Sequence, residues 1–227
     1  MKIQQGTRDA SGNWRHTDVA TSLKAPLVLV FSNRFLLEDD SIFTQLRAQF
    51  PDGHLVLGST AGEITGTNVL SDGLAYTAIE FEKSAFEIVS ASILEHNKES
   101  FATGKVLAER INKNGLKHVF VLSEGSFVNG SELINGLSSV LDADIAITGG
   151  LCGDDARFEK TLCGYNRPAK EGEVVLIGLY GDSLEISFAN YGGWFSFGPE
   201  RLITKSSGNV LYELDHRPAL DLYKKYL

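Results

Sequence analysis

The stretch Gly149-Gly150-Leu151-Cys152-Gly153-Asp154 follows an apolar run, residues 145–148, and places three glycines within five positions. Glycine adopts positive φ angles at no steric cost, so the chain can turn sharply here and approach another segment closely. A second stretch of this kind lies earlier, where the apolar residues 55–57 lead into residues 58–63 (GSTAGE). Both stretches predict a strand that ends in a glycine turn closed by an acidic residue.

The spacing of the two stretches indicates an internal duplication. A shift of 91 positions carries residues 58–63 onto 149–154, and the same shift carries the apolar run 28–32 onto 119–123 without a gap. The alternative is a chance likeness, because two β-α-β units share apolar strands by construction. The ungapped match over strand, helix and turn favours duplication.

We therefore expect an α/β fold of two tandem β-α-β-hairpin repeats, over about residues 27–96 and 118–191, packed as mixed sheets with helices on their faces. Each repeat is expected to run strand, helix, strand, glycine turn and hairpin. Alternating apolar residues separated by turn signals predict the two hairpins. Their strands are expected at residues 74–81 with 86–94, and at 174–180 with 184–189.

Three further segments complete the predicted organisation. Residues 1–24 are polar and are expected to be an N-terminal extension that packs across a domain of residues 25–227. A helix over residues 101–111 is expected to bridge the two repeats. Residues 192–227 form a C-terminal segment that ends in a helix from Pro218 to Tyr226.

Composition places the chain among ordinary globular proteins. Its 227 residues are 43% hydrophobic and 22% charged, and the formal net charge is −8. A negative net charge argues against general affinity for nucleic acid or an anionic membrane surface. No apolar run reaches the roughly 18 residues that span a bilayer, and no signal-peptide core follows Met1, so we expect a cytoplasmic protein.

The chain resembles the FIST domain family from about Ala25 to Leu227. The motifs that carry the resemblance are residues 58–63, residues 149–158, Glu124, residues 129–131 (NGS), residues 209–214 (NVLYEL) and residues 218–223 (PALDLY). The resemblance implies a FIST N-type sensory domain of bacterial or archaeal signal transduction. Such domains are proposed to bind small ligands such as amino acids and to signal to a kinase, a cyclase or a chemotaxis receptor. It also implies an alternative, because some relatives are described as haem-binding nitric oxide sensors.

The chain departs from the family in two respects. FIST regions usually continue into a C-terminal half, which the resemblance does not find in this chain, so the predicted site is expected to be one wall of a larger one. Many relatives are expected to have Ala where this chain has Cys152. Amides in a glycine turn can lower a thiol pKa, so Cys152 is either a small side chain filling a tight turn or a reactive thiol.

The two glycine turns are candidates for one ligand cleft. Duplicated units arrange equivalent loops around a pseudo-twofold axis, and α/β proteins place ligands at the carboxyl ends of strands. The alternative is that the glycines only permit tight strand exits and that both acids are solvated or act as caps. If the cleft forms, its carboxylates would repel phosphate and attract a cationic group.

An amino-acid-like ligand fits this chemistry. Its ammonium would meet Glu63, Asp154 or Glu124, and Arg157 could bind its carboxylate in bidentate fashion. A salt bridge from Arg157 to Asp154 or Glu159 is the alternative. The predicted ligand-binding residues are Ser59, Thr60, Glu63, Glu124, Ser126, Cys152, Asp154 and Arg157.

The residue pattern gives little support to an enzymatic role, a metal site or a cofactor. In GSTAG the serine holds the second position, whereas a nucleophile elbow needs it in the third. Glu63 with Asp154 as a general acid and base, in a hydrolase-like enzyme, remains an alternative. The histidines and the two cysteines lack metal-ligand spacing, so no metal and no cofactor are expected. Haem needs only one axial His, and it stays open, as does a scaffold role in association.

Overall fold

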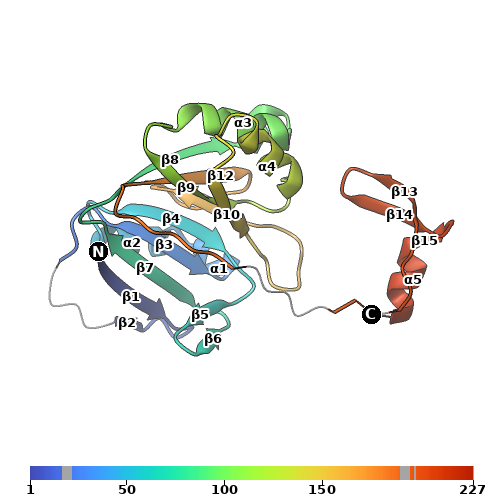
Figure 1. Cartoon of the computed structure of the whole chain (residues 1–227). Helices are drawn as coiled ribbons and strands as arrows, with labels where there is room; N and C mark the ends of the chain where they lie inside the picture. The colour runs from blue at the N-terminus through green and yellow to red at the C-terminus, as the bar shows by residue number, and fades with distance from the viewer. Residues whose placement is uncertain (17–21, 190–194, 197, 227) are drawn as a thin grey trace. The chain divides into compact units, whose positions relative to one another are not determined.

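The computed structural model describes residues 1–16, 22–189, 195–196 and 198–226, and Figure 1 traces the chain from its N-terminus to its C-terminus. Its contacts divide the chain into two units, Met1–Ile186 and Ser187–Leu227. No helix within the described ranges is long and apolar enough to cross a membrane.

The first sheet of unit Met1–Ile186 has six strands in the order β11-β4-β3-β7-β1-β2. At its centre β3 runs parallel to β4 and antiparallel to β7. Its strands are β1 (Lys2–Arg8), β2 (Trp14–His16), β3 (Leu27–Ser32), β4 (His54–Ser59), β7 (Leu74–Glu80) and β11 (Cys163–Tyr165). A small separate hairpin, β5 (Glu63–Thr65) and β6 (Asn68–Leu70), follows the first glycine turn.

The second sheet has four strands in the order β10-β9-β12-β8. Here β9 runs parallel to β10 and antiparallel to β12, which repeats the arrangement of β3, β4 and β7 in the first sheet. The strands are β8 (Ala85–Ser92), β9 (Leu116–Ser123), β10 (Ala146–Leu151) and β12 (Glu173–Tyr180). The strand β10 lies at one edge of this sheet.

Two helical layers cover the outer faces of the sheets. The first contains α1 (Arg34–Leu37) and α2 (Asp40–Gln49), and Asp39 caps α2 by accepting a hydrogen bond from the amide of Ser41. The second contains α3 (Ser100–Arg110) and α4 (Gly130–Ser138), which follow the 3-10 turn Ile93–His96. A side-chain oxygen at a helix start satisfies an amide that has no partner in the helix.

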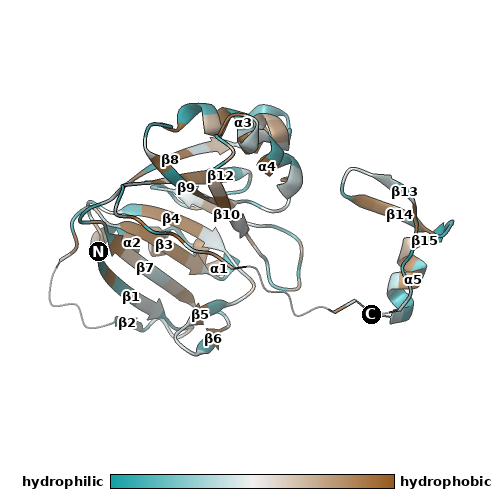
Figure 2. Cartoon of the chain, viewed as in Figure 1, coloured by the Kyte–Doolittle hydropathy of each residue, from teal (hydrophilic) through white to brown (hydrophobic). Residues whose placement is uncertain are grey.

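Alternation along the strands builds three apolar clusters. In β3, Val28 and Val30 face Ile42 and Leu46 of α2, while Leu27 belongs to a cluster between the two sheets. The second sheet packs in the same way against α3 and α4, and Figure 2 shows apolar colour concentrated on the strands. The unit is thus a four-layer α/β/β/α sandwich, and the predicted mixed α/β class with helices on the sheet faces is confirmed.

The predicted hairpins are wrong. The strands β7 and β8 lie in different sheets, because residues 81–84 cross between them and β8 pairs with β12 rather than with β7. Residues 184–189 form no strand in the part of the chain that the structure describes. Since β12 already has β9 and β8 as its two neighbours, it has no free edge for a hairpin partner.

The N-terminal residues belong to the first sheet rather than lying across it as an appendage. The strand β1 pairs antiparallel with β7 along its whole length, and β2 continues the sheet beyond β1. The strand β1 pairs with the edge of β7 that faces away from β3, just as β8 pairs with the edge of β12 that faces away from β9. Residues 17–21 of the predicted extension, and residues 190–191 at the predicted end of the second repeat, lie outside the described residues.

The described residues of unit Ser187–Leu227 form a three-stranded antiparallel sheet and one helix. The strands are β13 (Ile203–Ser207), β14 (Val210–Leu214) and β15 (Arg217–Pro218), in that order. The helix α5 (Ala219–Tyr226) confirms the helix predicted at this end of the chain.

Candidate functional site

The two glycine turns lie against each other. The amide of Gly153 donates to the carbonyl oxygen of Ser59 at 2.8 Å, and the hydroxyl of Ser59 donates to the carbonyl oxygen of Gly153 at 2.8 Å. A Cβ atom on Gly153 would lie 3.1 Å from the amide nitrogen of Ala61, so a glycine allows this close approach. The turns meet by direct hydrogen bonds at the carboxyl ends of β4 and β10.

Strand pairing shifts the match between the turns by one residue. Gly58 pairs with Phe31, whereas the residue that pairs with Leu122, 91 positions after Phe31, is Gly150 rather than Gly149. Gly149 has a φ of +141°. The shift is already present at the start of the strand, where His118 pairs with Ala146 while Leu27, 91 positions earlier, pairs with His54, so the extra residue precedes Ala146. Consequently β10 extends to Leu151, and the second turn proper begins only at Cys152.

Glu63 is a buried carboxylate with one unused oxygen. Its residue is 2% exposed, and its Oε1 accepts a hydrogen bond of 2.7 Å from the hydroxyl of Thr60. Its Oε2 is buried and has no hydrogen-bond partner among the described residues. Burial raises the pKa of Glu63, and the hydroxyl of Thr60 together with the nearby backbone amides of Gly73 and Glu63 offsets this only in part.

Glu63 lines a small polar pocket of about 130 Å³. Asn33 also lines it and donates to Asp72 Oδ1 at 3.2 Å. Arg157 lies 3.5 Å from Asp155 Oδ2 and 3.9 Å from Asp154 Oδ1, so the salt bridge to Asp154 expected as the alternative is present. The complete lining is Asn33, Thr60, Ala61, Gly62, Glu63, Ser71, Asp72, Asp155 and Arg157. The pocket therefore draws on both glycine-turn regions and sets three carboxylates beside one guanidinium.

Asp154 is used inside the protein. Its Oδ1 accepts a hydrogen bond of 2.7 Å from Arg34 Nε, and its Oδ2 accepts 3.1 Å bonds from the amides of Glu159 and Lys160. Burial alone would raise the pKa of Asp154, but Arg34 and the two amides together hold it below its usual value. The carboxylate thus anchors the loop after the second turn to α1.

Arg34 is the central residue that sequence reasoning missed. It is buried, and besides Asp154 it lies 3.2 Å from the carboxylates of Glu38 and Glu159. Its guanidinium also stacks on the ring of Phe35, with its central carbon 4.4 Å from the ring centroid. Its position directly after β3, at the carboxyl end of a central strand, is a signal that could have singled it out.

Glu124 and Ser126 belong to a separate, closed loop. Glu124 Oε1 accepts a bond of 2.6 Å from the hydroxyl of Thr161 and another from the amide of Ser126, while its Oε2 accepts from the amide of Phe127 at 3.1 Å. Glu124 is fully buried. Neither Glu124 nor Ser126 lines the pocket of Glu63.

Ser59 and Cys152 also lie away from that pocket. The hydroxyl of Ser59 is buried and accepts a 2.9 Å bond from the amide of Leu162 in addition to its bond to Gly153. Cys152 packs in the cluster between the sheets. Of the eight predicted residues, the pocket brings together Thr60, Glu63 and Arg157.

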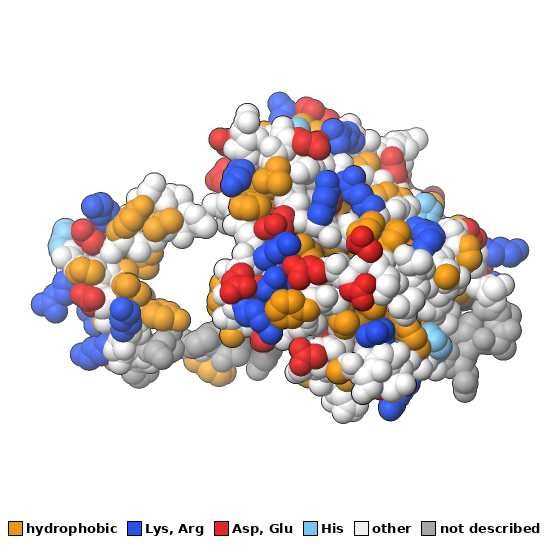
Figure 3. Space-filling model, turned by 180° about the vertical axis from the view of Figure 1, so that it is seen from behind, with side chains coloured by type: hydrophobic (Ala, Val, Ile, Leu, Met, Phe, Trp, Pro, Cys, Tyr) orange, Lys and Arg blue, Asp and Glu red, His pale blue; other side chains and the backbone are white. Residues whose placement is uncertain are grey.

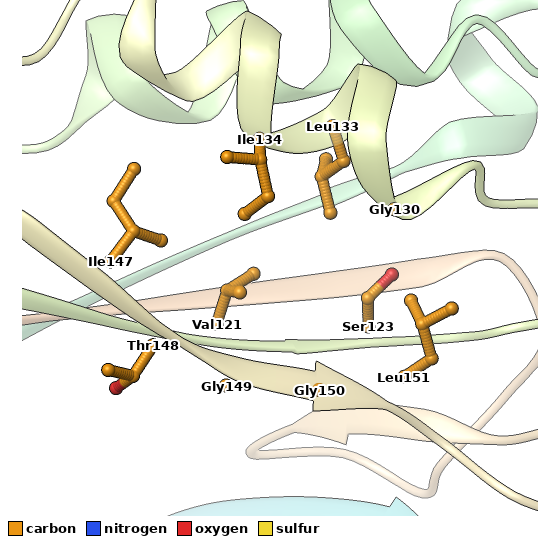
Figure 4. A pocket seen from close by; sticks show the side chains of 10 residues that line it. All are labelled: Val121, Ser123, Gly130, Leu133, Ile134, Ile147, Thr148, Gly149, Gly150 and Leu151. Atoms are coloured by element: carbon orange, nitrogen blue, oxygen red, sulfur yellow. The ribbon is translucent and has the colours of Figure 1, made fainter. Parts of the chain in front are cut away.

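A second, apolar groove of about 250 Å³ lies between the edge strand β10 and α4. Figure 4 shows Leu133 and Ile134 pointing from the helix toward Val121 and Ile147 on the strands. The groove is lined by Val121, Ser123, Gly130, Leu133, Ile134, Ile147, Thr148, Gly149, Gly150 and Leu151. None of these residues carries an imidazole, a thiol or a thioether, so a haem seated here would receive no such axial ligand from the lining.

Charged side chains of both signs are interspersed on the face of the molecule seen in Figure 3. Among the surface ion pairs, Lys160 lies 3.1 Å from Glu38 and 3.8 Å from Glu171. Such a surface offers no extended basic stripe on this face for a nucleic-acid backbone.

The two-sheet α/β sandwich carries a polar pocket at its paired turns. The chain matches the FIST N domain over residues 26–217 and so belongs to the FIST family, whose domains are sensory modules of signal transduction. The chain is also 27% identical, over an alignment 226 residues long, to the uncharacterized protein MJ1623 of Methanocaldococcus jannaschii. The match covers 90% of this chain and 40% of that relative.

Proposed function

We propose that unit Met1–Ile186 is the ligand-binding part of this sensory domain, and that its ligand is a small amino-acid-like zwitterion. The observation that carries the proposal is the buried Oε2 of Glu63, which lacks a hydrogen-bond partner among the described residues in a pocket that also contains Arg157. A buried acceptor without a partner costs about 1–3 kcal/mol, and a bound donor would remove that cost.

The charges of the pocket support a ligand with both an ammonium and a carboxylate. Glu63, Asp72 and Asp155 favour a cationic group, and a charge-assisted hydrogen bond to a carboxylate is about twice as strong as a neutral one. Arg157 presents a planar fork that matches a ligand carboxylate. Phosphate groups would meet three acids and a single base, which disfavours nucleotides.

The size of the pocket supports a small ligand. A water molecule occupies about 30 Å³ of liquid, so a cavity of about 130 Å³ holds roughly four waters or one compact molecule. Drug-sized and cofactor pockets are about 300–1,000 Å³. We therefore propose no cofactor for this pocket, and an amino acid with a short side chain is its best occupant.

Binding is favoured over hydrolysis by the state of Asp154. A general acid and base pair needs two carboxylates free to exchange protons with a substrate. Asp154 already accepts hydrogen bonds from Arg34 and two amides, and it does not line the pocket of Glu63. We accordingly propose a non-catalytic role for both acids.

We propose that the two sheets arose by duplication, that the protein is cytoplasmic, and that the signal passes to an output protein or domain of the kinase, cyclase or chemotaxis-receptor type. The identical strand arrangement β4-β3-β7 and β10-β9-β12 supports the duplication. The family supports the signalling role.

The test is a thermal-shift screen of the full chain against individual amino acids, repeated with Glu63→Gln and with the matched control Glu95→Gln. Glu95 is an exposed acid of the 3-10 turn and lines none of the pockets described above. A ligand that binds only the folded state raises the melting temperature in a saturable way. We expect a response from at least one short amino acid in the wild type and the control, and its loss in Glu63→Gln. A ligand bound by Glu63→Gln at wild-type strength would contradict the proposal, as would a response to haemin with a Soret band and to no amino acid.

A further inference from the structure

The two cysteines of the chain, Cys152 and Cys163, lie at the two ends of one loop. The loop between them carries Asp154, Asp155 and Arg157. Both thiols are free and buried, and both belong to the cluster between the sheets. Segments at the two ends of the loop therefore come back together in the core.

Gly58 links the positions of the two side chains. Cys163 of β11 pairs directly with Gly58 of β4, and cross-strand neighbours place their Cβ positions about 4.5–5.5 Å apart on the same face. The Sγ of Cys152 would lie 3.2 Å from a Cβ atom on Gly58. Because Gly58 has no side chain, the space over it holds the Sγ of Cys152 and the side chain of Leu122, beside the strand position of Cys163.

The strand β9 gives an independent position for both residues. The Sγ of Cys163 donates a weak hydrogen bond to the carbonyl oxygen of Leu122 at 3.5 Å, and the amide of Cys152 donates to the carbonyl oxygen of the next residue, Ser123, at 2.7 Å. Burial is the main cause that raises the pKa of the Cys163 thiol, and the neighbouring Cys152 side chain raises it further. The side chain of Cys152 is thus close enough to that of Cys163 to affect its pKa.

We propose that Cys152 and Cys163 are a redox modification site that forms an intramolecular disulfide when the protein is exposed to a peroxide. Cys152, 7% exposed, is the sulfur more open to oxidant than Cys163, which is 0% exposed. Its thiolate attacks one peroxide oxygen, the O–O bond breaks, and the sulfur becomes a sulfenic acid as hydroxide leaves. Cys163 then attacks that sulfur, the S–O bond breaks, and the oxygen leaves as water with the thiol proton. Two thiols are oxidised by two electrons while one peroxide is reduced to two waters.

The disulfide would close the loop that anchors Arg34 through Asp154 and carries Arg157. Closing a loop restricts the unfolded chain and limits local opening of the segment between its ends. The pocket wall formed by Asp155 and Arg157 would be held in place in the oxidised protein. The disulfide itself does not depend on the proposed ligand.

The experiment uses the full chain, reduced with dithiothreitol, desalted and treated with hydrogen peroxide. We expect the intact mass to fall by two hydrogen atoms and to return on renewed reduction. Trypsin cleaves after Arg157 and Lys160, so without reduction the peptides holding Cys152 and Cys163 should appear joined. The proposal is overturned if both cysteines can still be alkylated in denaturant after peroxide treatment, or if they carry sulfinic acid without a link between them.

Two variants serve as matched controls. Cys152→Ser and Cys163→Ser each retain one thiol, so neither can lose two hydrogen atoms to an intramolecular bond. The wild-type measurement does not require either variant to fold. A linked peptide found only in dimers would also overturn the proposal, because the geometry places both sulfurs within one chain.

Discussion

The Nε of Arg34 lies 2.7 Å from Oδ1 of Asp154, and the two side chains are 8% and 1% exposed. The pair joins residues 120 positions apart and connects the helix after β3 to the turn after β10. Arg34 thus follows the central strand β3 of the first sheet, and Asp154 follows the edge strand β10 of the second. The ion pair holds together the region from which the polar pocket is built.

Removing Arg34 is expected to destabilise the fold strongly. Arg34→Met removes the cation that is hydrogen-bonded to the buried carboxylate of Asp154 and leaves only Arg157, at 3.9 Å, beside it. We expect a cost of about 3 kcal/mol, the lower end of the usual range for breaking a buried pair, because Arg157 still offsets part of the charge. Urea unfolding measures the change. Lys105→Met is the control, since its exposed i,i+4 pair with Glu109 at 3.9 Å is worth about half a kcal/mol. Equal losses in the two variants would contradict a structural role for Arg34.

The contribution of Asp154 should depend on pH in a defined direction. Its folded pKa lies below the unfolded value of about 3.9, so its stabilisation is fully present above that value and is lost as pH falls through the folded pKa. The unfolding free energy of wild type should therefore exceed that of Asp154→Asn at neutral pH, and the gap should narrow in strong acid. Urea titrations at a series of pH values measure the gap. A difference in unfolding free energy that stays constant down to the lowest pH would show that the charge of Asp154 does not stabilise the fold.

Glu63 should behave in the opposite way. Its folded pKa is raised, so the native state binds more protons than the unfolded state between about pH 4.3 and the folded pKa. The unfolding free energy of wild type should fall as pH rises through this window, whereas Glu63→Gln should lack this fall. The unfolding free energy of the variant minus that of wild type should therefore be larger at pH 7 than at pH 4. A pH-independent difference between the two proteins would mean that burial of the charge carries no cost.

The fold class could be predicted because it depends on local sequence patterns. The two hairpins were predicted wrongly because strand pairing depends on residues far apart in the sequence. Alternation in β3 and the cap at Asp39 identify strands and helices within a few residues. The partner of β8 depends instead on which edge is open in a distant sheet. The rings of Phe81 and Phe86, 5.7 Å apart, pack between the sheets where the chain crosses. A hairpin and a crossover share the same alternating pattern, so periodicity cannot tell them apart.

The site divides in the same way. Thr60, Glu63 and Arg157 were predicted from the glycine turns and line one pocket, although their binding role stays a prediction. The carboxylate of Asp154 accepts a hydrogen bond from Arg34, 120 positions away. The carboxylate of Glu124 accepts one from Thr161, 37 positions away. The sequence marks a carboxylate near a turn, but only tertiary packing decides whether an internal donor reaches it first.

Gly149 and Gly150 offer a direct test of which glycine of the second stretch the fold requires. A Cβ on Gly149, whose φ is +141°, would lie 1.8 Å from the carbonyl oxygen of Val121, while a Cβ on Gly150 would meet nothing within 4 Å. Gly149→Ala must therefore displace β10 from β9 and should cost more than about 2 kcal/mol of unfolding free energy, whereas Gly150→Ala should change it by no more than about 0.5 kcal/mol. Thermal and urea unfolding of the two variants provide the comparison. Equal tolerance at both positions would show that the one-residue shift between the turns is wrong, and with it the pairing of Leu122 with Gly150.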